Sequence, residues 1–370
     1  MVKISVIVPV YNVSEYLEDA LSGLLNQTFH DFEAICVNDG SKDNSLEILN
    51  EFAKKDSRIK VIDKENGGCG SARNRALDAA SGEYIYFFDP DDYIAPNAFE
   101  ELYENITSND SDLVIFKIAW FMEGEPVNYK KPMFNFDEIF TDVDFNNFTF
   151  TFRDVKRYVL NVAFAPWSKL YRKEFLDKYD DFRFDLGVAF DDVPFHVKSM
   201  LRATKISFAP DFYYHYRYAN PNSVNNTSSN GIDIMKIVDI VEGFLKSEGY
   251  FDELEKEFYE FKVRQIFMYM LSSHSEEYFR LAQEKLLEVK EFDVPEDLIQ
   301  RYYWAINANS FKEYELNVKV DGYQKRVNKL SKENKSLKKE IKKNKKINDE
   351  LLSSKSWKIT KPLRKMNIFK

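Results

Sequence analysis

The sequence contains almost no cysteine, with Cys36 and Cys69 as its two thiols among 370 residues. Two thiols give no disulfide framework, and their spacing matches no metal site, so we interpret both as small buried or nearly buried residues. Long apolar runs are also missing. The longest run near the N-terminus, residues 4–10, is interrupted by Pro9 and followed by polar residues. The sequence therefore predicts neither a signal peptide nor a membrane-spanning helix, and the cytoplasm is the expected compartment.

Two nucleotide-binding motifs are missing as well. No Walker A sequence occurs, and the glycines of residues 66–74 have the wrong spacing for a dinucleotide-binding fingerprint and do not follow the first predicted strand. The chain also lacks the glycine-rich, basic opening loop of a nucleotidyltransferase that makes nucleotide sugars. These absences argue against P-loop, dinucleotide-binding and nucleotidyltransferase functions.

Charge is distributed unevenly along the chain. Residues 319–370 contain 18 Lys and Arg against 5 Asp and Glu, a net +13 that leaves −22 for the rest of a chain whose total is −9. An acidic body argues against nucleic-acid binding, and the basic tail indicates an anionic partner for the tail alone.

Apolar runs alternate with helical patterns in residues 1–118. Residues 4–10 (ISVIVPV) and 33–38 (EAICVN) are typical of strands that are buried on both faces, and the leucines between them have helical spacing. The same alternation predicts helices over 44–54, 71–80 and 96–106 and strands over 60–63, 83–88 and 112–118. We expect a doubly wound α/β sheet whose ligands bind beyond the carboxyl ends of the strands.

The remaining chain divides into four further regions by its patterns. Residues 119–225 lose the alternation, and we expect them to complete the sheet and build the second wall of the cleft. Residues 226–315 predict a helical region. Residues 316–352 form an unbroken heptad pattern, and residues 353–370 form a basic amphipathic tail.

The heptad pattern predicts a parallel two-stranded coiled coil and hence a homodimer. One seam position is occupied by Val320, Val327, Asn334, Ile341 and Asn348, and the other by Leu316, Tyr323, Leu330, Leu337, Asn344 and Leu351. Glu333 with Lys338, and Glu340 with Lys345, have the spacing that pairs charges between parallel chains. The alternative is a single solvated, lysine-rich helix.

Polar segments follow several predicted strands. They are Pro9-Val10-Tyr11-Asn12, the Asn38-Asp39-Gly40-Ser41-Lys42-Asp43 segment and Asp89-Pro90-Asp91-Asp92, and a further segment runs from Asn66 to Asn74. In this order they resemble the motifs of the family-2 glycosyltransferases of GT-A fold. The resemblance is close over residues 3–120 and looser up to residue 225.

This resemblance implies a metal-dependent, inverting transfer of a hexosyl or N-acetylhexosaminyl group. The donor would be a nucleoside diphosphate sugar, with UDP favoured, and the acceptor a saccharide or lipid-linked molecule in surface glycan synthesis. The competing interpretation is a non-catalytic coiled-coil scaffold with an inactive nucleotide-binding domain. Conversion of UDP-sugars in the presence of Mn²⁺ would discriminate between the two.

The donor site implied by the resemblance draws on several of these segments. Asp39 lies where a strand meets a Gly-Ser turn, so its carboxylate can accept the imide N–H of uracil, although it could instead cap that turn. Arg73 can pair with phosphate. The residues expected to bind the nucleotide sugar are Pro9, Tyr11, Asn12, Glu15, Asp39, Asn66, Gly67, Arg73, Asp89, Asp91 and Arg217.

The predicted metal site consists of Asp89, Asp91 and Asp92, with His215 as a further ligand. Three carboxylates within four positions concentrate negative charge, and hard oxygen ligands select Mg²⁺ or Mn²⁺. Asp91 is the preferred direct ligand. The alternatives are a solvated acidic turn for the aspartates and a structural role for His215.

The acceptor side is predicted from two later segments. Asp191 and Asp192 resemble the family's Glu-Asp pair, with Asp192 aligned to the general base and Asp191 in place of the usual Glu. A carboxylate that only caps the following helix is the alternative. Trp167 and Lys169 belong to a segment similar to the family's Trp-Asn-Lys-Leu motif, and Trp167 could stack on an acceptor sugar or be a core residue.

The tail segment 356–364 (SWKITKPLR) resembles a terminal segment of many enzymes that build surface glycans. Its aromatic and aliphatic residues are interleaved with lysines, which suits the surface of an anionic membrane. A disordered basic end is the alternative. The tail would place the protein at the inner face of the cell membrane as a peripheral protein.

Overall fold

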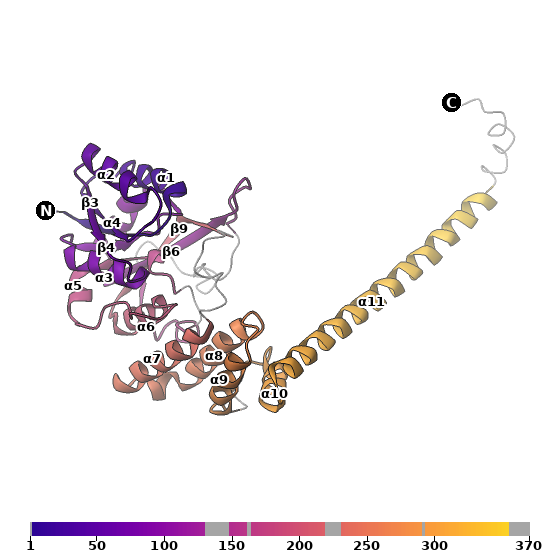
Figure 1. Cartoon of the computed structure of the whole chain (residues 1–370). Coiled ribbons are helices and arrows are strands. Elements are labelled where there is room, and N and C mark those ends of the chain that lie inside the picture. The colour runs from indigo at the N-terminus through magenta and orange to yellow at the C-terminus, as the bar shows by residue number, and fades with distance from the viewer. Residues whose placement is uncertain (1, 130–147, 161–163, 219–230, 291–292, 355–370) are drawn as a thin grey trace, which may run out of the picture. The chain divides into compact units, whose positions relative to one another are not determined.

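The computed structural model describes residues 2–129, 148–160, 164–218, 231–290 and 293–354 (Figure 1). The chain divides into two compact units, Met1–Ile299 and Gln300–Lys370. The boundary after Ile299 splits the region 226–315 that the sequence pattern treats as one helical part. Each unit is described separately below.

The first part of the first unit alternates strands and helices, as the sequence predicts. Its described elements are β1 (Ile4–Val10), α1 (Ser14–Leu25), β2 (Phe32–Asp39), α2 (Ser45–Lys55), β3 (Ile59–Lys64), α3 (Cys69–Ala79), β4 (Tyr84–Phe87), β5 (Tyr93–Ile94), α4 (Ala98–Ser108) and β6 (Leu113–Phe121). Strands β1 to β4 are parallel, in the order β3-β2-β1-β4.

Later segments extend the same sheet and make it mixed. They supply β7 (Thr149–Phe150), β8 (Lys169–Arg172), α5 (Lys173–Asp177), α6 (Asp192–Arg202) and β9 (Ile206–Arg217). Strand β8 lies antiparallel between β4 and β6, and the described residues form a nine-stranded sheet with the continuous order β3-β2-β1-β4-β8-β6-β9-β5. The predicted α/β mixed sheet is thereby confirmed.

Helices cover both faces of this sheet because side chains alternate along each strand. Tyr86 and Phe87 are neighbours on β4, so they point to opposite faces. The ring of Tyr86 packs against Phe99 of α4, with centroids 5.4 Å apart, whereas the ring of Phe87 packs against Phe195 of α6 at 5.5 Å. The sheet is therefore enclosed between a layer that contains α4 and a layer that contains α6.

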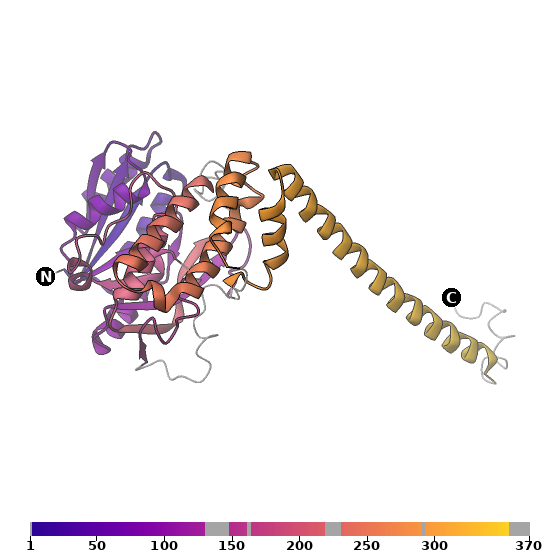
Figure 2. The same ribbon diagram turned by 90° about the horizontal axis from the view of Figure 1, so that it is seen from below.

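Three more helices belong to the first unit: α7 (Asp233–Ser247), α8 (Phe251–Met270) and α9 (Glu276–Leu287). Figure 2 shows them as adjacent rods. Lys262 of α8 is fully buried and forms ion pairs with Glu242 and Glu288, which compensates a charge that would otherwise be costly to bury.

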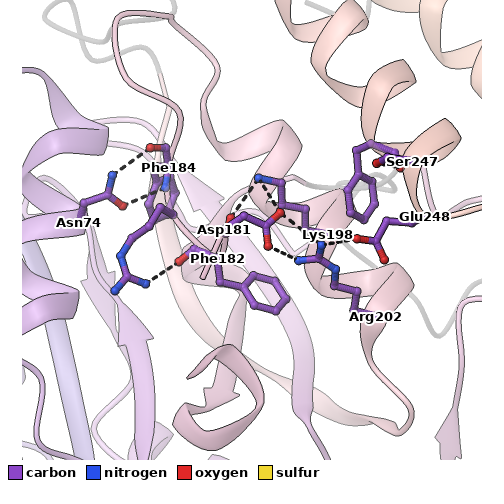
Figure 3. A network of polar contacts seen from close by, with 10 residues as sticks. Asn74, Asp181, Phe182, Phe184, Lys198, Arg202, Ser247 and Glu248 are labelled. Atoms are coloured by element: carbon purple, nitrogen blue, oxygen red, sulfur yellow. Dashed lines mark hydrogen bonds and ion pairs between the residues drawn. The ribbon is translucent and has the colours of Figure 1, made fainter. Parts of the chain in front are cut away.

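A polar network fixes the chain segment that precedes α6 (Figure 3). Asn74 of α3 donates to the carbonyl oxygen of Phe184 and accepts from its N–H, at 2.9 and 2.8 Å. Asp181 accepts from Arg202 of α6 at 2.6 Å, and Arg202 also donates to Glu248, next to the end of α7, at 2.6 Å. The network ties α3, this segment, α6 and the end of α7 together.

The second unit is dominated by α11 (Phe311–Ser353), which follows α10 (Ile299–Asn307). Ser310 caps α11 by accepting a hydrogen bond from the N–H of Glu313. The predicted helix over the heptad region is confirmed, and its seam residues are between 54% and 68% exposed: Leu316, Val320, Tyr323, Val327, Leu330, Leu337, Ile341 and Leu351. The segment 356–364 lies outside the described residues.

In the part of the chain that the structure describes, none of the helices is both long enough and apolar enough to span a bilayer.

Candidate functional site

The loops after β1 and β2 meet at one edge of the sheet, because the two strands are parallel and in register up to Val10 and Asn38. Asn12, which has a φ of 50°, accepts a hydrogen bond from the N–H of Lys42 at 2.7 Å and donates from its own N–H to Ser41. Tyr11 is exposed beside this contact. The structure thus brings together the first two segments predicted to bind a nucleotide.

Asp39 organises the loop that follows β3. Its buried carboxylate accepts hydrogen bonds from the N–H groups of Gly67 and Gly68, at 3.0 and 2.8 Å, and from Lys64 at 2.5 Å. Asn66 donates to the carbonyl oxygen of Asp39 at 2.9 Å. These partners lie beyond β3 rather than in the Gly-Ser turn, so the alternative in which Asp39 only caps its own turn is wrong.

Two other residues predicted to bind the donor, Pro9 and Glu15, lie in β1 and α1. Pro9 is buried within β1, where it pairs with Val37 of β2. Glu15 is exposed in the first turn of α1 and raises the pKa of Tyr16, after the larger effect of burial.

Arg73 of α3 connects Asp89, which follows β4, to Asp191, which precedes α6. Its side chain is 7% exposed, and its guanidinium donates to Asp89 at 2.9 Å and lies 3.7 Å from a carboxylate oxygen of Asp191. The guanidinium also lies over the ring of Phe184, 5.2 Å from its centroid. A buried cation is tolerated only where anionic partners compensate its desolvation, and here these partners come from two distant parts of the chain.

Asp92 is directed into the core, which corrects its prediction as a metal ligand. It is 1% exposed and accepts hydrogen bonds from the hydroxyl of Tyr214 and from the N–H of Arg217, both at 2.6 Å. Burial raises its pKa well above the usual range, and the charges of Asp91 and Asp89 add to this effect. The carboxylate of Asp92 is therefore used to attach the acidic loop to β9.

Arg217 has a related structural role. Its Nε donates to the carbonyl oxygen of Asp91 at 2.8 Å, and its guanidinium lies over the rings of Tyr16, Tyr93 and Phe121 and pairs with Glu123. Arg217 thus holds the backbone of Asp91, and its binding of the nucleotide sugar stays a prediction.

His215 lies on the opposite face of β9 from Tyr214, whose hydroxyl binds Asp92, and its role as a metal ligand stays a prediction. Tyr214 and Tyr216, its neighbours on β9, both stack on Trp167, with ring centroids 4.4 and 5.5 Å away. Side chains alternate along a strand, so His215 points to the opposite face, where its ring lies 6.4 Å from that of Tyr129.

A cation at the acidic loop would depend on few protein ligands. Within the described residues, no group of three or more His, Cys, Asp or Glu side chains is arranged to hold a metal ion. Of the three aspartates predicted as metal ligands, Asp92 is buried, whereas Asp89 and Asp91 are half-buried. Both raise the pKa of the neighbouring Asp92, so negative charge is concentrated here and a cation would be stabilised. Further ligands would have to come from a bound diphosphate.

Asp191 and Asp192 begin α6 beside Arg73. Asp191 is 9% exposed at the N-cap position, but its side chain accepts no capping hydrogen bond from the described helix, so the alternative of a simple cap is wrong for this residue. Burial raises the pKa of Asp191 to about 7, an effect that Arg73 opposes and Asp192 reinforces. Burial also raises the pKa of Asp192. A carboxylate whose pKa is raised toward neutrality is suited to proton transfer near neutral pH.

Trp167 and Lys169, predicted to bind an acceptor, are both buried. The ring of Trp167 lies nearly parallel to that of Tyr214, at 6°. The ammonium of Lys169 donates to the Ser168 hydroxyl and the Ala165 carbonyl oxygen, and burial lowers its pKa to about 7. This environment agrees with the alternative in which Trp167 is a core residue.

Sequence reasoning missed three residues that shape the site: Lys64, Asn74 and Phe184. Lys64 binds Asp39, while Asn74 holds Phe184 under Arg73. Asn74 could have been found from its place in the Ala-Arg-Asn segment. The other two carry no signal in the sequence because their partners lie far away along the chain.

Comparison with known proteins gives three consistent findings. The family model described as "Glycosyl transferase family 2" matches residues 5–180. The glycosyltransferase EpsJ of Bacillus subtilis, described as uncharacterized, is 35% identical over 60% of this chain and 62% of its own length. The glycosyltransferase GlyG of Streptococcus pneumoniae is 34% identical over 66% of this chain and 78% of its own. The chain thus spans less than two thirds of EpsJ.

Among solved structures, residues 1–349 of S. aureus TarS in complex with UDP-GlcNAc are similar to this chain. The TM-score is 0.67 at 25% sequence identity, and the match covers 84% of this chain and 89% of TarS 1–349.

Gly70 offers a test of the site's packing. A Cβ atom at this position would lie 2.1 Å from Oδ2 of Asp191 and 3.0 Å from Cβ of Phe184. We expect Gly70→Ala to displace Asp191 and to lower the free energy of unfolding by about 1–3 kcal/mol, as overpacking does. Urea denaturation measures this change.

Gly23→Ala is the matched control, because Gly23 also lies in a helix and a Cβ there would meet nothing within 4 Å. It should raise the free energy of unfolding by roughly 0.5–1 kcal/mol, since alanine favours the helix. Equal stabilisation by both substitutions would show that Asp191 does not press against α3.

Proposed function

Because this chain belongs to glycosyl transferase family 2, we propose that it transfers a sugar from a UDP-linked donor, with inversion, to a saccharide or lipid-linked acceptor in surface glycan synthesis. The transferred group would be a hexose or an N-acetylhexosamine. The observation that carries the proposal is the buried cluster of Arg73, Asp89 and Asp191, which joins the donor loops to two carboxylates with raised pKa. The similarity to TarS, solved with UDP-GlcNAc, supports a UDP-sugar donor.

The donor would lie across the carboxyl ends of β1, β2 and β4. Asp39 and the exposed Tyr11 would contact the base, and Arg73 would contact the diphosphate. Asp91, with Asp89 beside it, would hold Mn²⁺ or Mg²⁺, which neutralises the charge on the departing nucleoside diphosphate. No covalent enzyme intermediate is required, because inversion proceeds by direct displacement.

The acceptor would be activated by Asp192. The carboxylate of Asp191 forms an ion pair with Arg73 and packs against Gly70. Asp192, in contrast, is partly exposed at the first position of α6. In this arrangement Asp192 takes the proton of an acceptor hydroxyl. The hydroxyl oxygen then attacks the anomeric carbon, and the diphosphate leaves from the opposite side. Asp191 holds Arg73, which connects the two sides of the site.

The competing function is a coiled-coil scaffold with an inactive nucleotide-binding domain. Against it stands the energetic cost of the site: the Arg73 guanidinium and the Asp191 carboxylate are buried beside the half-buried Asp89 and Asp192, and Asp191 and Asp192 have raised pKa values. Such perturbed groups are typical of catalytic centres. If the protein were such a scaffold, it would bind a nucleotide but would not convert a nucleotide sugar.

The function is tested by screening UDP-sugars for release of UDP, with and without Mn²⁺. We expect turnover of at least one donor with the metal. Asp91→Asn should abolish it while leaving the thermal unfolding temperature unchanged, because the substitution removes a metal-ligand charge but little volume. Asp19→Asn, on the exposed face of α1, is the matched control and should retain activity. Full activity of Asp91→Asn would refute the metal assignment.

The base assignment is tested with Asp192→Asn and Asp191→Asn. Asp192→Asn should bind the donor normally and lose about 10²–10⁴-fold in kcat, as removal of a general base does. The wild-type rate should increase with pH over the range in which Asp192 loses its proton, because a protonated carboxyl cannot act as a base and burial raises its pKa above the usual value. If Asp191→Asn is the more damaging change, the base is Asp191.

We also propose that α11 pairs with a second copy of the chain as a parallel coiled coil. Its exposed seam would be buried in the dimer, and in-register pairing places each of Asn334, Asn344 and Asn348 opposite its own copy. Two tails 353–370 would then emerge at the same end. Doubling the basic charge would strengthen contact with an anionic membrane surface at the inner face of the cell membrane.

Sedimentation of the full chain and of a chain without residues 316–370 tests both parts of this proposal. The full chain should be a dimer that associates with anionic vesicles, and the truncated chain a monomer that does not pellet with them but still turns over the donor. A full-length monomer would refute the coiled coil. A truncated chain that still pellets would place the membrane contact elsewhere.

A further inference from the structure

The turn that leads into the catalytic aspartates has a strained backbone. Phe190, directly before Asp191, has a φ of 64°, a left-handed conformation that bulky side chains rarely adopt. Such a conformation persists only where the surrounding structure imposes it. The question is therefore which elements hold this turn.

The sheet side constrains one end of the turn. The carboxylate of Asp191 lies against Gly70 of α3 and close to Arg73. The carbonyl oxygen of Phe190 accepts from the N–H of Val193 at 3.1 Å, which closes the first turn of α6. These contacts fix the aspartates but leave the ring of Phe190 to other elements.

The helices beyond the sheet constrain the other end. Asp233, the first residue of α7, accepts a hydrogen bond from the N–H of Ala189 at 3.0 Å. The ring of Tyr269, near the end of α8, packs against that of Phe190 with centroids 5.0 Å apart and planes at 45°. Two helices of the first unit thus contact two successive residues of the turn.

The negative charge of Asp192 also acts electrostatically on the hydroxyl of Tyr269. Burial, together with the negative charge of Asp192, raises the pKa of Tyr269 to about 12. The phenol is therefore neutral at physiological pH.

We propose that α7 and α8 are part of the catalytic unit, with Tyr269 as a positioning residue that holds the Asp191–Asp192 turn through its ring contact with Phe190. The inference rests on the proposed function in taking Asp192 as the general base. It assigns these helices, which lie outside the residues 5–180 matched by the family model, a role in catalysis.

Hydrogen exchange in the full-length chain tests the contact directly. Tyr269→Ala should accelerate exchange of the amides of residues 189–193 by roughly three- to tenfold, in line with the loss of one aromatic pair. Tyr269→Phe keeps the ring and should restore wild-type exchange. Met268→Ala, the exposed neighbour on the same helix, is the matched control and should have no effect on these amides.

Kinetics with the UDP-sugar that gives the highest turnover provide the second measurement. Tyr269→Ala should lower kcat while leaving the KM for the donor unchanged, because the donor loops lie on other elements. Tyr269→Phe should recover most of the lost kcat.

Unchanged exchange and kcat in Tyr269→Ala would overturn the inference, as would equal effects of Met268→Ala, which would indicate general loosening of α8. A wild-type chain that turns over no UDP-sugar would instead contradict the proposed function. The exchange data would then decide by themselves whether α8 holds the turn.

Discussion

The arrangement of the site depends on the buried guanidinium of Arg73. An unpaired cation in this environment would be strongly destabilising, so the carboxylates of Asp89 and Asp191 must stay beside it. One of them follows β4 and the other precedes α6. A single electrostatic requirement therefore brings together two segments that are separated by about a hundred residues of chain.

The cluster of Arg73, Asp89 and Asp191 can form only because the surrounding backbone leaves space for these side chains. Gly70 provides the space that the carboxylate of Asp191 occupies, and the Asn74 amide fixes Phe184 under the guanidinium. Arg202 anchors the same segment on its other side through Asp181. The turn before α6 is thus held from α3, from α6 and, as we infer, from α8, and these contacts fix Asp191 and Asp192.

The three aspartates of the loop after β4, Asp89, Asp91 and Asp92, make different contacts. Asp92 attaches the loop to β9 through Tyr214 and Arg217, and Asp89 neutralises Arg73. Asp91 has its backbone carbonyl oxygen held by Arg217, and we propose its carboxylate as the cation ligand. Asp89 and Asp92 therefore differ in their structural roles, which follow from the partners that the tertiary structure gives each one.

The sequence by itself determined the order of strands and helices in the first 118 residues and the family of the fold. Buried parallel strands produce continuous apolar runs, and the polar segments at their ends mark the ligand edge, so both can be identified without distant contacts. It also determined the long helix α11, whose heptad pattern is local. Arg73, Asp89 and Asp191 all belong to the segments that the sequence marks as candidate site residues, and the structure brings these three side chains together.

Only the tertiary structure decided the contacts of Asp92, His215, Trp167 and Arg217. Each of these depends on which face of β9 a side chain occupies or on a partner that lies far away in the sequence. A strand's alternation gives two faces but does not say which face meets the site. That choice is made by the packing of Trp167 on Tyr214, a contact between residues that no local pattern connects.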